Sequence, residues 1–103
     1  MSHKSKRLCG AVHRTLSLCL SSMLNDGTVR SLGVESVEPA PNPGWLLVVL
    51  RADRPLDPWE CERALRVLDS RRGALRAEIA SAVNRRRVPD LTFRVLGPGE
   101  ARS

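Results

Sequence analysis

Aromatic residues are the scarcest class in this sequence, which has two tryptophans, one phenylalanine and no tyrosine among 103 residues. Domains that bind single-stranded nucleic acid by base stacking, such as RRM and OB folds, depend on several exposed aromatic rings. The composition therefore argues against a stacking platform. Trp45 and Trp59 occupy strand and helix positions of a kind that is usually buried, and we expect both in the core.

Acidic residues are also few, since 11 Asp and Glu stand against 17 Lys and Arg, for a net charge of +6. Such a surface attracts polyanions, of which nucleic acid is the usual one. A GC-rich genome would explain why Arg outnumbers Lys, but it would not explain the net charge. No acidic residue precedes Asp26, as in a mitochondrial transit peptide. We favour a folded helix there, because it holds much of the apolar content.

Cysteine is limited to Cys9, Cys19 and Cys61, with no C-x-x-C pair, which predicts reduced thiols in an intracellular, cytoplasmic protein. The longest apolar run, Trp45–Leu50, is too short to cross a bilayer, so we expect no membrane partner. A Walker loop, a dinucleotide fingerprint and a paired-carboxylate motif are all missing. We therefore predict a protein that is not an enzyme and uses no cofactor.

Cys9 and His13 lie one helical turn apart and raise the question of a metal site. Zinc normally takes four ligands, and the sequence offers no further partners at a suitable spacing. A nucleophilic Cys–His pair would also need a third, orienting group. The pattern favours a core thiol beside a surface imidazole, and no metal.

Hydrophobic periodicity predicts one domain over residues 1–103, folded from about 5 to 96, with a mobile tail at 97–103. We expect a first helix that begins at Ser5 and is stopped by Asn25, Asp26 and Gly27. An edge strand over Ser31–Glu38 and a central strand at "WLLVVLR" should follow. The second half should contain a helix from Asp57 to about Asp69, a helix from after Gly73 to about Asn84, and a strand over Leu91–Leu96. This α+β order, α-β-β-α-α-β, with helices on one face of a three-stranded sheet, matches the KH-like type II arrangement.

The two central helical patterns cannot join smoothly. One unbroken helix would place Arg72 in the middle of the buried stripe, where a lone guanidinium is costly. Gly73 is also poorly suited to a helix interior and well suited to unusual backbone angles. We therefore predict two helices that meet at a kink near Ser70–Gly73, with Arg71 and Arg72 facing water.

The stretch "SRRGALRAEIASAVNRRRVPDLTFRV" resembles the ribosome-binding factor A family. That family has a kinked helix pair, a basic turn, and Val-Pro-Asp/Glu-Leu-x-Phe leading into the last strand, here Val88–Phe93. A looser similarity runs through "KRLCGAVHRTLSLCL". Arg71 stands where the family usually has a small Ala, and Asp26-Gly27-Thr28 replaces its Asp-Pro-Arg. The resemblance implies a KH-like monomer that binds small-subunit 16S rRNA in immature 30S particles and assists rRNA maturation.

A cluster of basic residues is the main candidate site. Six arginines fall within seventeen residues, opposed only by Glu78. Guanidinium groups pair with phosphate oxygens, and each neutralised phosphate releases counterions. The alternative is a solvated face whose last arginines complement a helix C-terminus. We predict RNA binding by a surface that comprises Arg71, Arg72, Gly73, Arg76, Arg85, Arg86 and Arg87, extended by Lys6, Arg7 and Arg14 together with Lys4.

Two other functions fit the same residues. One is a general KH-like RNA-binding protein that acts on mRNA or small RNA. The other is a module whose basic face meets an acidic protein. Co-sedimentation with small subunits, compared with affinity for unstructured oligonucleotides, would separate the two RNA-binding functions. Nuclease treatment of a pull-down would separate both from a protein partner.

Overall fold

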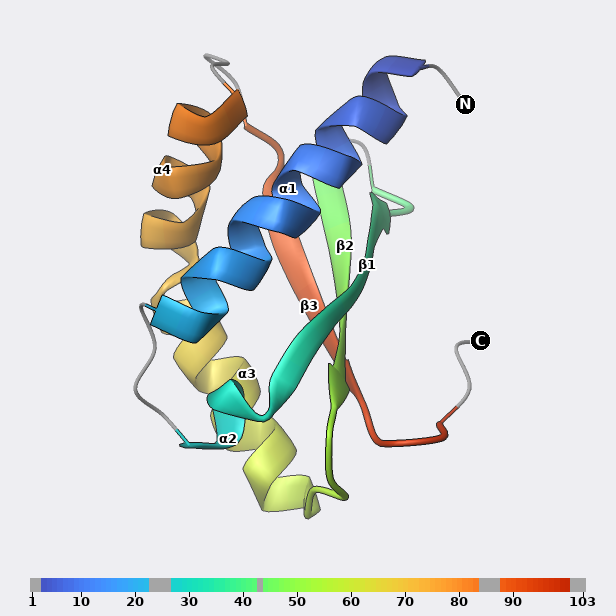
Figure 1. Ribbon diagram of the computed structural model, residues 1–103, viewed down its shortest axis with the longest axis vertical. Helices are drawn as coiled ribbons and strands as arrows, with labels where there is room; N and C mark the ends of the chain where they lie inside the picture. Colours follow the sequence, from blue (N-terminus) through green and yellow to red (C-terminus); the bar gives the residue numbers. More distant parts are fainter. Residues whose placement is uncertain (1–2, 23–26, 43, 84–87, 101–103) are drawn as a thin grey trace.

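The chain folds into a helical layer that covers one face of a small sheet (Figure 1). The computed structural model describes residues 3–22, 27–42, 44–83 and 88–100. Its elements in chain order are α1 (His3–Ser22), α2 (Gly27–Arg30), β1 (Leu32–Pro39), β2 (Trp45–Ala52), α3 (Pro58–Ser70), α4 (Arg72–Val83) and β3 (Asp90–Leu96). The predicted α+β class and element order are confirmed, with the short α2 as an unpredicted addition.

The strands are arranged in the order β1-β2-β3, so β2 is the central strand, as its two apolar faces predict. β1 pairs with β2 antiparallel across the short loop between them. β3 pairs with β2 parallel, because α3 and α4 carry the chain back to the starting edge of the sheet. The result is the mixed three-stranded sheet of a KH-like type II fold.

Alternate residues of β2, namely Leu46, Val48 and Leu50, point to the helices and are 0 to 5% exposed. α1 packs on β1 and α4, and α3 packs on β3. Helical periodicity places Leu8, Val12, Leu16, Cys19, Leu20 and Met23 on one face of α1. The first five are buried or half-buried in the same core, and Met23 lies outside the described residues. Helices thus bury the stripes that the sequence displays.

One boundary of α1 differs from the prediction. The helix begins at His3, two residues before the expected cap Ser5, and it ends at Ser22. The expected stop signal at Asn25 and Asp26 lies outside the described residues, and Gly27 opens α2. The face of α1 opposite the core carries Arg7, Gly10, Arg14, Ser17 and Ser21, and all five are exposed.

A bulge explains why β1 does not alternate cleanly. Val34 is opposite Leu50 and Ser36 is opposite Val49, so Glu35 is an extra residue on the edge strand. Its carboxylate accepts a hydrogen bond from Nε of Arg51 on β2. The hydrogen bond to Glu35 raises the pKa of Arg51 above its ordinary value.

The same guanidinium attaches the segment after β3. Nη1 of Arg51 donates to the carbonyl oxygens of Gly97 and Glu100, at 2.8 Å each. Residues 97–100 therefore lie against the sheet, whereas 101–103 are outside the described part. The mobility of 97–103 stays a prediction.

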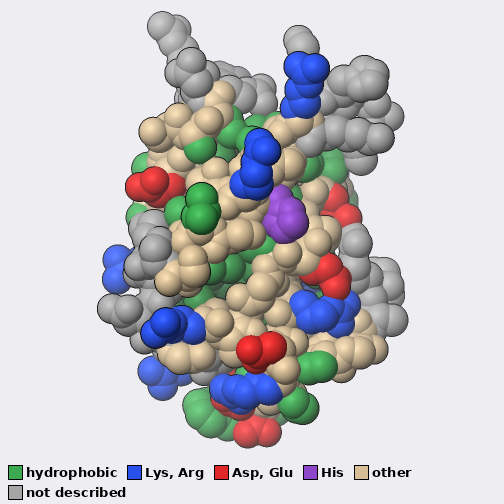
Figure 2. All heavy atoms as spheres, viewed as in Figure 1, with side chains coloured by type: hydrophobic (Ala, Val, Ile, Leu, Met, Phe, Trp, Pro, Cys, Tyr) green, Lys and Arg blue, Asp and Glu red, His purple; other side chains and the backbone are tan. Residues whose placement is uncertain are grey.

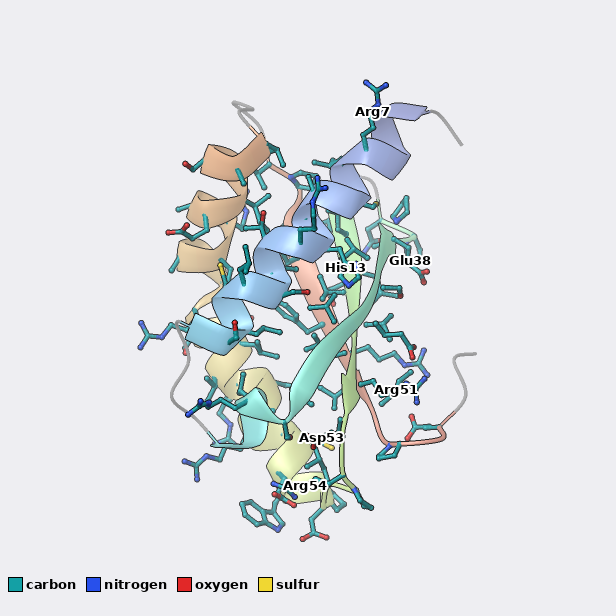
Figure 3. The ribbon with its side chains drawn as sticks, in the orientation of Figure 1. Arg7, His13, Glu38, Arg51, Asp53 and Arg54 are labelled. Atoms are coloured by element: carbon teal, nitrogen blue, oxygen red, sulfur yellow. The ribbon has the colours of Figure 1, made fainter. Side chains whose placement is uncertain are left out.

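α3 begins at the motif "DPWE", residues Asp57–Glu60. Asp57 caps the helix, Pro58 occupies its first turn, and Glu60 completes a capping box by accepting a hydrogen bond from the Asp57 N–H at 3.1 Å. Glu60 also pairs with Nη2 of Arg54 at 2.9 Å. These bonds hold the β2–α3 connection at the far end of the molecule from the start of α1 (Figure 3).

Candidate nucleic-acid interface

The predicted kink is confirmed, and it occupies a single residue. α3 ends at Ser70 and α4 begins at Arg72. Arg71 lies between them with φ −102° and ψ 3°, and its N–H donates to the Val67 and Leu68 carbonyls at 3.2 and 3.1 Å. The Arg71 carbonyl in turn accepts from the Leu75 N–H at 2.9 Å. The two helices are thus joined by a tight turn with its backbone groups satisfied.

Gly73 does not make the kink. It lies inside the first turn of α4 and is exposed, and its φ is not in the left-handed region. An added Cβ would meet nothing within 4 Å. The expectation of unusual backbone angles at Gly73 is wrong, because the irregular angles fall on Arg71, two residues earlier.

Arg72 is not a free surface group. Its guanidinium lies 3.4 Å from Asp69 and 3.6 Å from Asp90, with the side chain 36% exposed. It also lies over the ring of Trp45, 5.8 Å from the centroid, in a cation–π contact. The prediction that Arg72 faces water is therefore wrong. Trp45 and Asp90 are paired residues at the starts of β2 and β3, so Arg72 connects the kink to the sheet.

Arg76 is also held within the fold. Its Nη2 donates to the Val88 carbonyl at 2.9 Å, and its Nε is buried without a hydrogen-bond partner. The bond fastens α4 to the chain just before β3. A guanidinium used in this way has fewer donors left for a ligand.

Arg71 is exposed and, within the described ranges, makes no side-chain hydrogen bond or ion pair. Arg85, Arg86 and Arg87 lie outside the described residues. Of the three arginines of the predicted cluster that the structure describes, Arg71 is exposed and Arg72 and Arg76 are half-buried.

The exposed face of α1 carries the other predicted cations. Arg7 and Arg14 are exposed, seven residues apart and thus on one side of the helix. Figure 3 shows Arg7 projecting from the first turns of α1, away from the sheet. The backbone of Lys4 and Lys6 lies in the same turns, while their side chains are outside the described part. Figure 2 shows basic side chains spread over this face, with acidic ones mainly at its edges and lower end.

Sequence reasoning does not single out Arg30. It closes α2, is exposed, and borders a cavity of about 110 Å³ between α1, α2 and β1. The cavity is lined by Ser17, Leu20, Ser21, Arg30, Leu32, Gly33 and Val34. No local motif signals it, since an isolated Arg in a four-residue helix meets α1 only in the folded chain.

Cys9 and His13 have separate structural environments. The Nε2 of His13 lies 2.8 Å from the Val34 carbonyl, so this ring bonds to β1 and is half-buried, not the surface imidazole expected. Burial and then nearby Glu38 raise the pKa of the Cys9 thiol. A thiol held protonated is a poor nucleophile and a poor metal ligand. Within the described ranges, no group of three or more His, Cys, Asp or Glu side chains could hold a metal ion.

The two tryptophans differ. Trp45 is half-buried under Arg72, whereas Trp59 in the first turn of α3 is 60% exposed. The expectation that Trp59 is in the core is wrong, because only Ala64 and Leu68 of α3 are buried.

The part of the chain that the structure describes contains no helix of sufficient length and hydropathy to span a membrane.

The known proteins that match this chain are solved structures. No family model and no curated protein matches the chain. The crystal structure of ribosome-binding factor A from Thermus thermophilus superposes with a TM-score of 0.70 at 28% identity, over 88% of this chain and 94% of that one. A homology model of the same Thermus thermophilus factor, fitted into a cryo-EM map of its 30S complex, gives 0.70 at 29% identity, over 98% and 100%. The resemblance to ribosome-binding factor A is confirmed.

Proposed function

We propose that this protein, which resembles ribosome-binding factor A in fold and in sequence, is a ribosome biogenesis factor that binds 16S rRNA in immature 30S particles. In this proposal it assists rRNA maturation, acts as a cytoplasmic monomer and catalyses no reaction. The observation that carries the proposal is the match along the full length of the factor fitted into a 30S complex, at 29% identity. It extends over the sheet and the kinked helix pair alike.

The charge distribution supports RNA as the partner. The net charge is +6, and exposed guanidinium groups occur at Arg7 and Arg14 on α1 and at Arg71 on the kink. Guanidinium groups hold phosphate oxygens in pairs of hydrogen bonds, largely without regard to base sequence. Affinity would come from the backbone of a folded RNA and selectivity from its shape.

Arg72 and Arg76 have a different role in this proposal. They fix the angle between α3 and α4 through Asp69, Asp90 and the Val88 carbonyl. They would shape the surface that Arg71 presents. Arg85, Arg86 and Arg87 remain predicted phosphate contacts.

The direct test is a sucrose-gradient profile of tagged protein from its own cells. We expect the protein to travel with immature small subunits, and the association to be lost after nuclease treatment. Co-sedimentation would be compared with affinity for unstructured RNA oligonucleotides. Preference for the oligonucleotides would indicate a general KH-like binder of mRNA or small RNA, and a nuclease-resistant complex would indicate an acidic protein partner. Either result would contradict the proposal.

A further inference from the structure

The cavity between α1, α2 and β1 combines one cation, two hydroxyl groups and an apolar floor. We infer that it binds a single ribose-phosphate unit of RNA, an inference that rests on the proposed function. At about 110 Å³ it is too small for a cofactor, since such sites are typically about 300 to 1,000 Å³. A group the size of one sugar is a better match.

Arg30 supplies the positive charge. It is exposed at the cavity, at the end of α2, and within the described ranges no carboxylate pairs with it. Arg72, by comparison, has two carboxylates within 3.6 Å. An arginine without an internal partner keeps its forked set of donors for an external phosphate.

The serine hydroxyl groups distinguish ribose from phosphate. Ser17 Oγ donates its hydrogen to the His13 carbonyl at 2.9 Å, and Ser21 Oγ donates to the Leu18 carbonyl at 2.9 Å. Each oxygen is then left with lone pairs, so it acts as an acceptor. A phosphate oxygen cannot donate to it, but a ribose 2′-hydroxyl can. The 2′-hydroxyl is the group by which a protein distinguishes RNA from DNA.

The floor of the cavity is apolar. Leu20 and Leu32 are 4% and 6% exposed, and half-buried Val34 lies beside them. The carbon-bound face of a sugar ring could pack on such a floor while its hydroxyl reaches a serine. A free inorganic anion would gain nothing from these contacts, so the floor also favours a sugar-phosphate.

The cavity continues the exposed face of α1. Arg7, Arg14 and Ser21 are spaced by seven residues and share one side of the helix. An RNA backbone that contacts Arg7 and Arg14 would therefore be directed toward Arg30. The cavity would anchor one nucleotide of that strand in a defined position.

The inference can be tested on the full chain with a fluorescent RNA hairpin and the same hairpin in DNA, measured by anisotropy. We expect the wild type to prefer RNA. Arg30→Gln should weaken binding to both hairpins by about fivefold to tenfold, as for one lost charge-assisted contact. The double variant Ser17→Ala with Ser21→Ala should weaken binding to RNA alone and so reduce the preference. Arg30, Ser17 and Ser21 are all exposed, so we expect both variants to fold, and circular dichroism would verify this.

Arg66→Gln is the matched control. Arg66 is 80% exposed on α3 and does not border the cavity, so we expect wild-type affinity for both hairpins. The inference is wrong if Arg30→Gln behaves like Arg66→Gln, or if the double serine variant retains the full wild-type preference for RNA. In either case wild-type co-sedimentation with small subunits would leave the proposed function standing. If the wild type binds neither subunits nor RNA, the proposed function itself fails.

Discussion

The helical surface has two arginine-rich regions that differ in what their guanidinium groups contact. On the α1–α2 side, Arg7, Arg14 and Arg30 are exposed and make no ion pair within the described residues. At the α3–α4 kink, Arg72 is held by Asp69 and Asp90, and Arg76 by the Val88 carbonyl. The sequence has its highest density of arginine near the kink, yet among the described residues more exposed arginines without an ion pair lie on α1 and α2.

The difference shows that arginines close together in the sequence have different structural environments. Arg72 and Arg76 connect the helices to β3 and to the chain before it, whereas Arg71 is exposed. Tertiary contacts decide which, since Asp90 and Trp45 reach Arg72 from distant parts of the sequence. Substitutions in the two regions should therefore separate binding from folding.

The largest effect should follow removal of the α1–α2 charges. We expect Arg7→Gln, Arg14→Gln and Arg30→Gln together to weaken small-subunit binding by about 100-fold at moderate salt, because three phosphate contacts are lost. The urea midpoint should be unchanged. Filter binding with purified subunits measures the affinity. Retention of wild-type affinity would place the binding surface elsewhere.

Arg72→Gln should act on stability. The change removes two ion pairs and a cation–π contact at a partly exposed position, so we expect a loss of about 1 kcal/mol in the free energy of unfolding. Arg71→Gln is the matched control, with an expected change near zero because Arg71 is exposed. Urea unfolding followed by circular dichroism compares them. Equal free energies of unfolding for the two variants would mean that the contacts of Arg72 contribute no stability.

The confirmed features are those that local chemistry determines. The capping box at Asp57 and Glu60, the apolar central strand and the stripe of α1 each follow from residue type and spacing. The kink is predicted because an unbroken helix would bury Arg72. Its exact residue is not, since Arg71 has ordinary side-chain chemistry and only its backbone angles are irregular.

The features that sequence reasoning misses depend on contacts between distant segments. The bulge at Glu35 depends on the register with β2, and the roles of Arg72 and Arg76 depend on β3 and the chain before it. Arg30 joins Ser17 at a cavity only because α2 packs beside α1. Trp59 is exposed because it does not lie on the face of α3 that buries Ala64 and Leu68.

Gly73→Ala tests whether the kink needs a glycine. Gly73 is helical with open space at its Cβ, so Ala should stabilise the protein by about 0.5 kcal/mol through helix propensity and reduced freedom of the unfolded chain. Subunit binding should be unaffected. Thermal unfolding measures the change, and a marked destabilisation would show that the junction requires glycine after all.

The smallest effect concerns a charge at the start of α3. The hydrogen bond from Arg54, and then the Asp57 N–H, lower the pKa of Glu60 below its ordinary 4.5. A lowered folded-state pKa gives stability that is present above pH 4.5 and is lost as the pH falls through the folded value. Wild type should therefore lose stability on acidification more steeply than Glu60→Gln. Urea midpoints at about pH 6 and about pH 3 test this, with Glu62→Gln as the exposed control.

The most direct measurement is the slope of log affinity for small subunits against log salt concentration, for wild type, the triple α1–α2 variant and Arg72→Gln. Each lost phosphate contact should reduce the slope by about 0.7 to 0.9. We predict that the triple variant loses about two units or more and that Arg72→Gln retains the wild-type slope. A full slope in the triple variant, with the loss found in Arg72→Gln, would contradict the division between arginines that bind RNA and arginines that hold the fold.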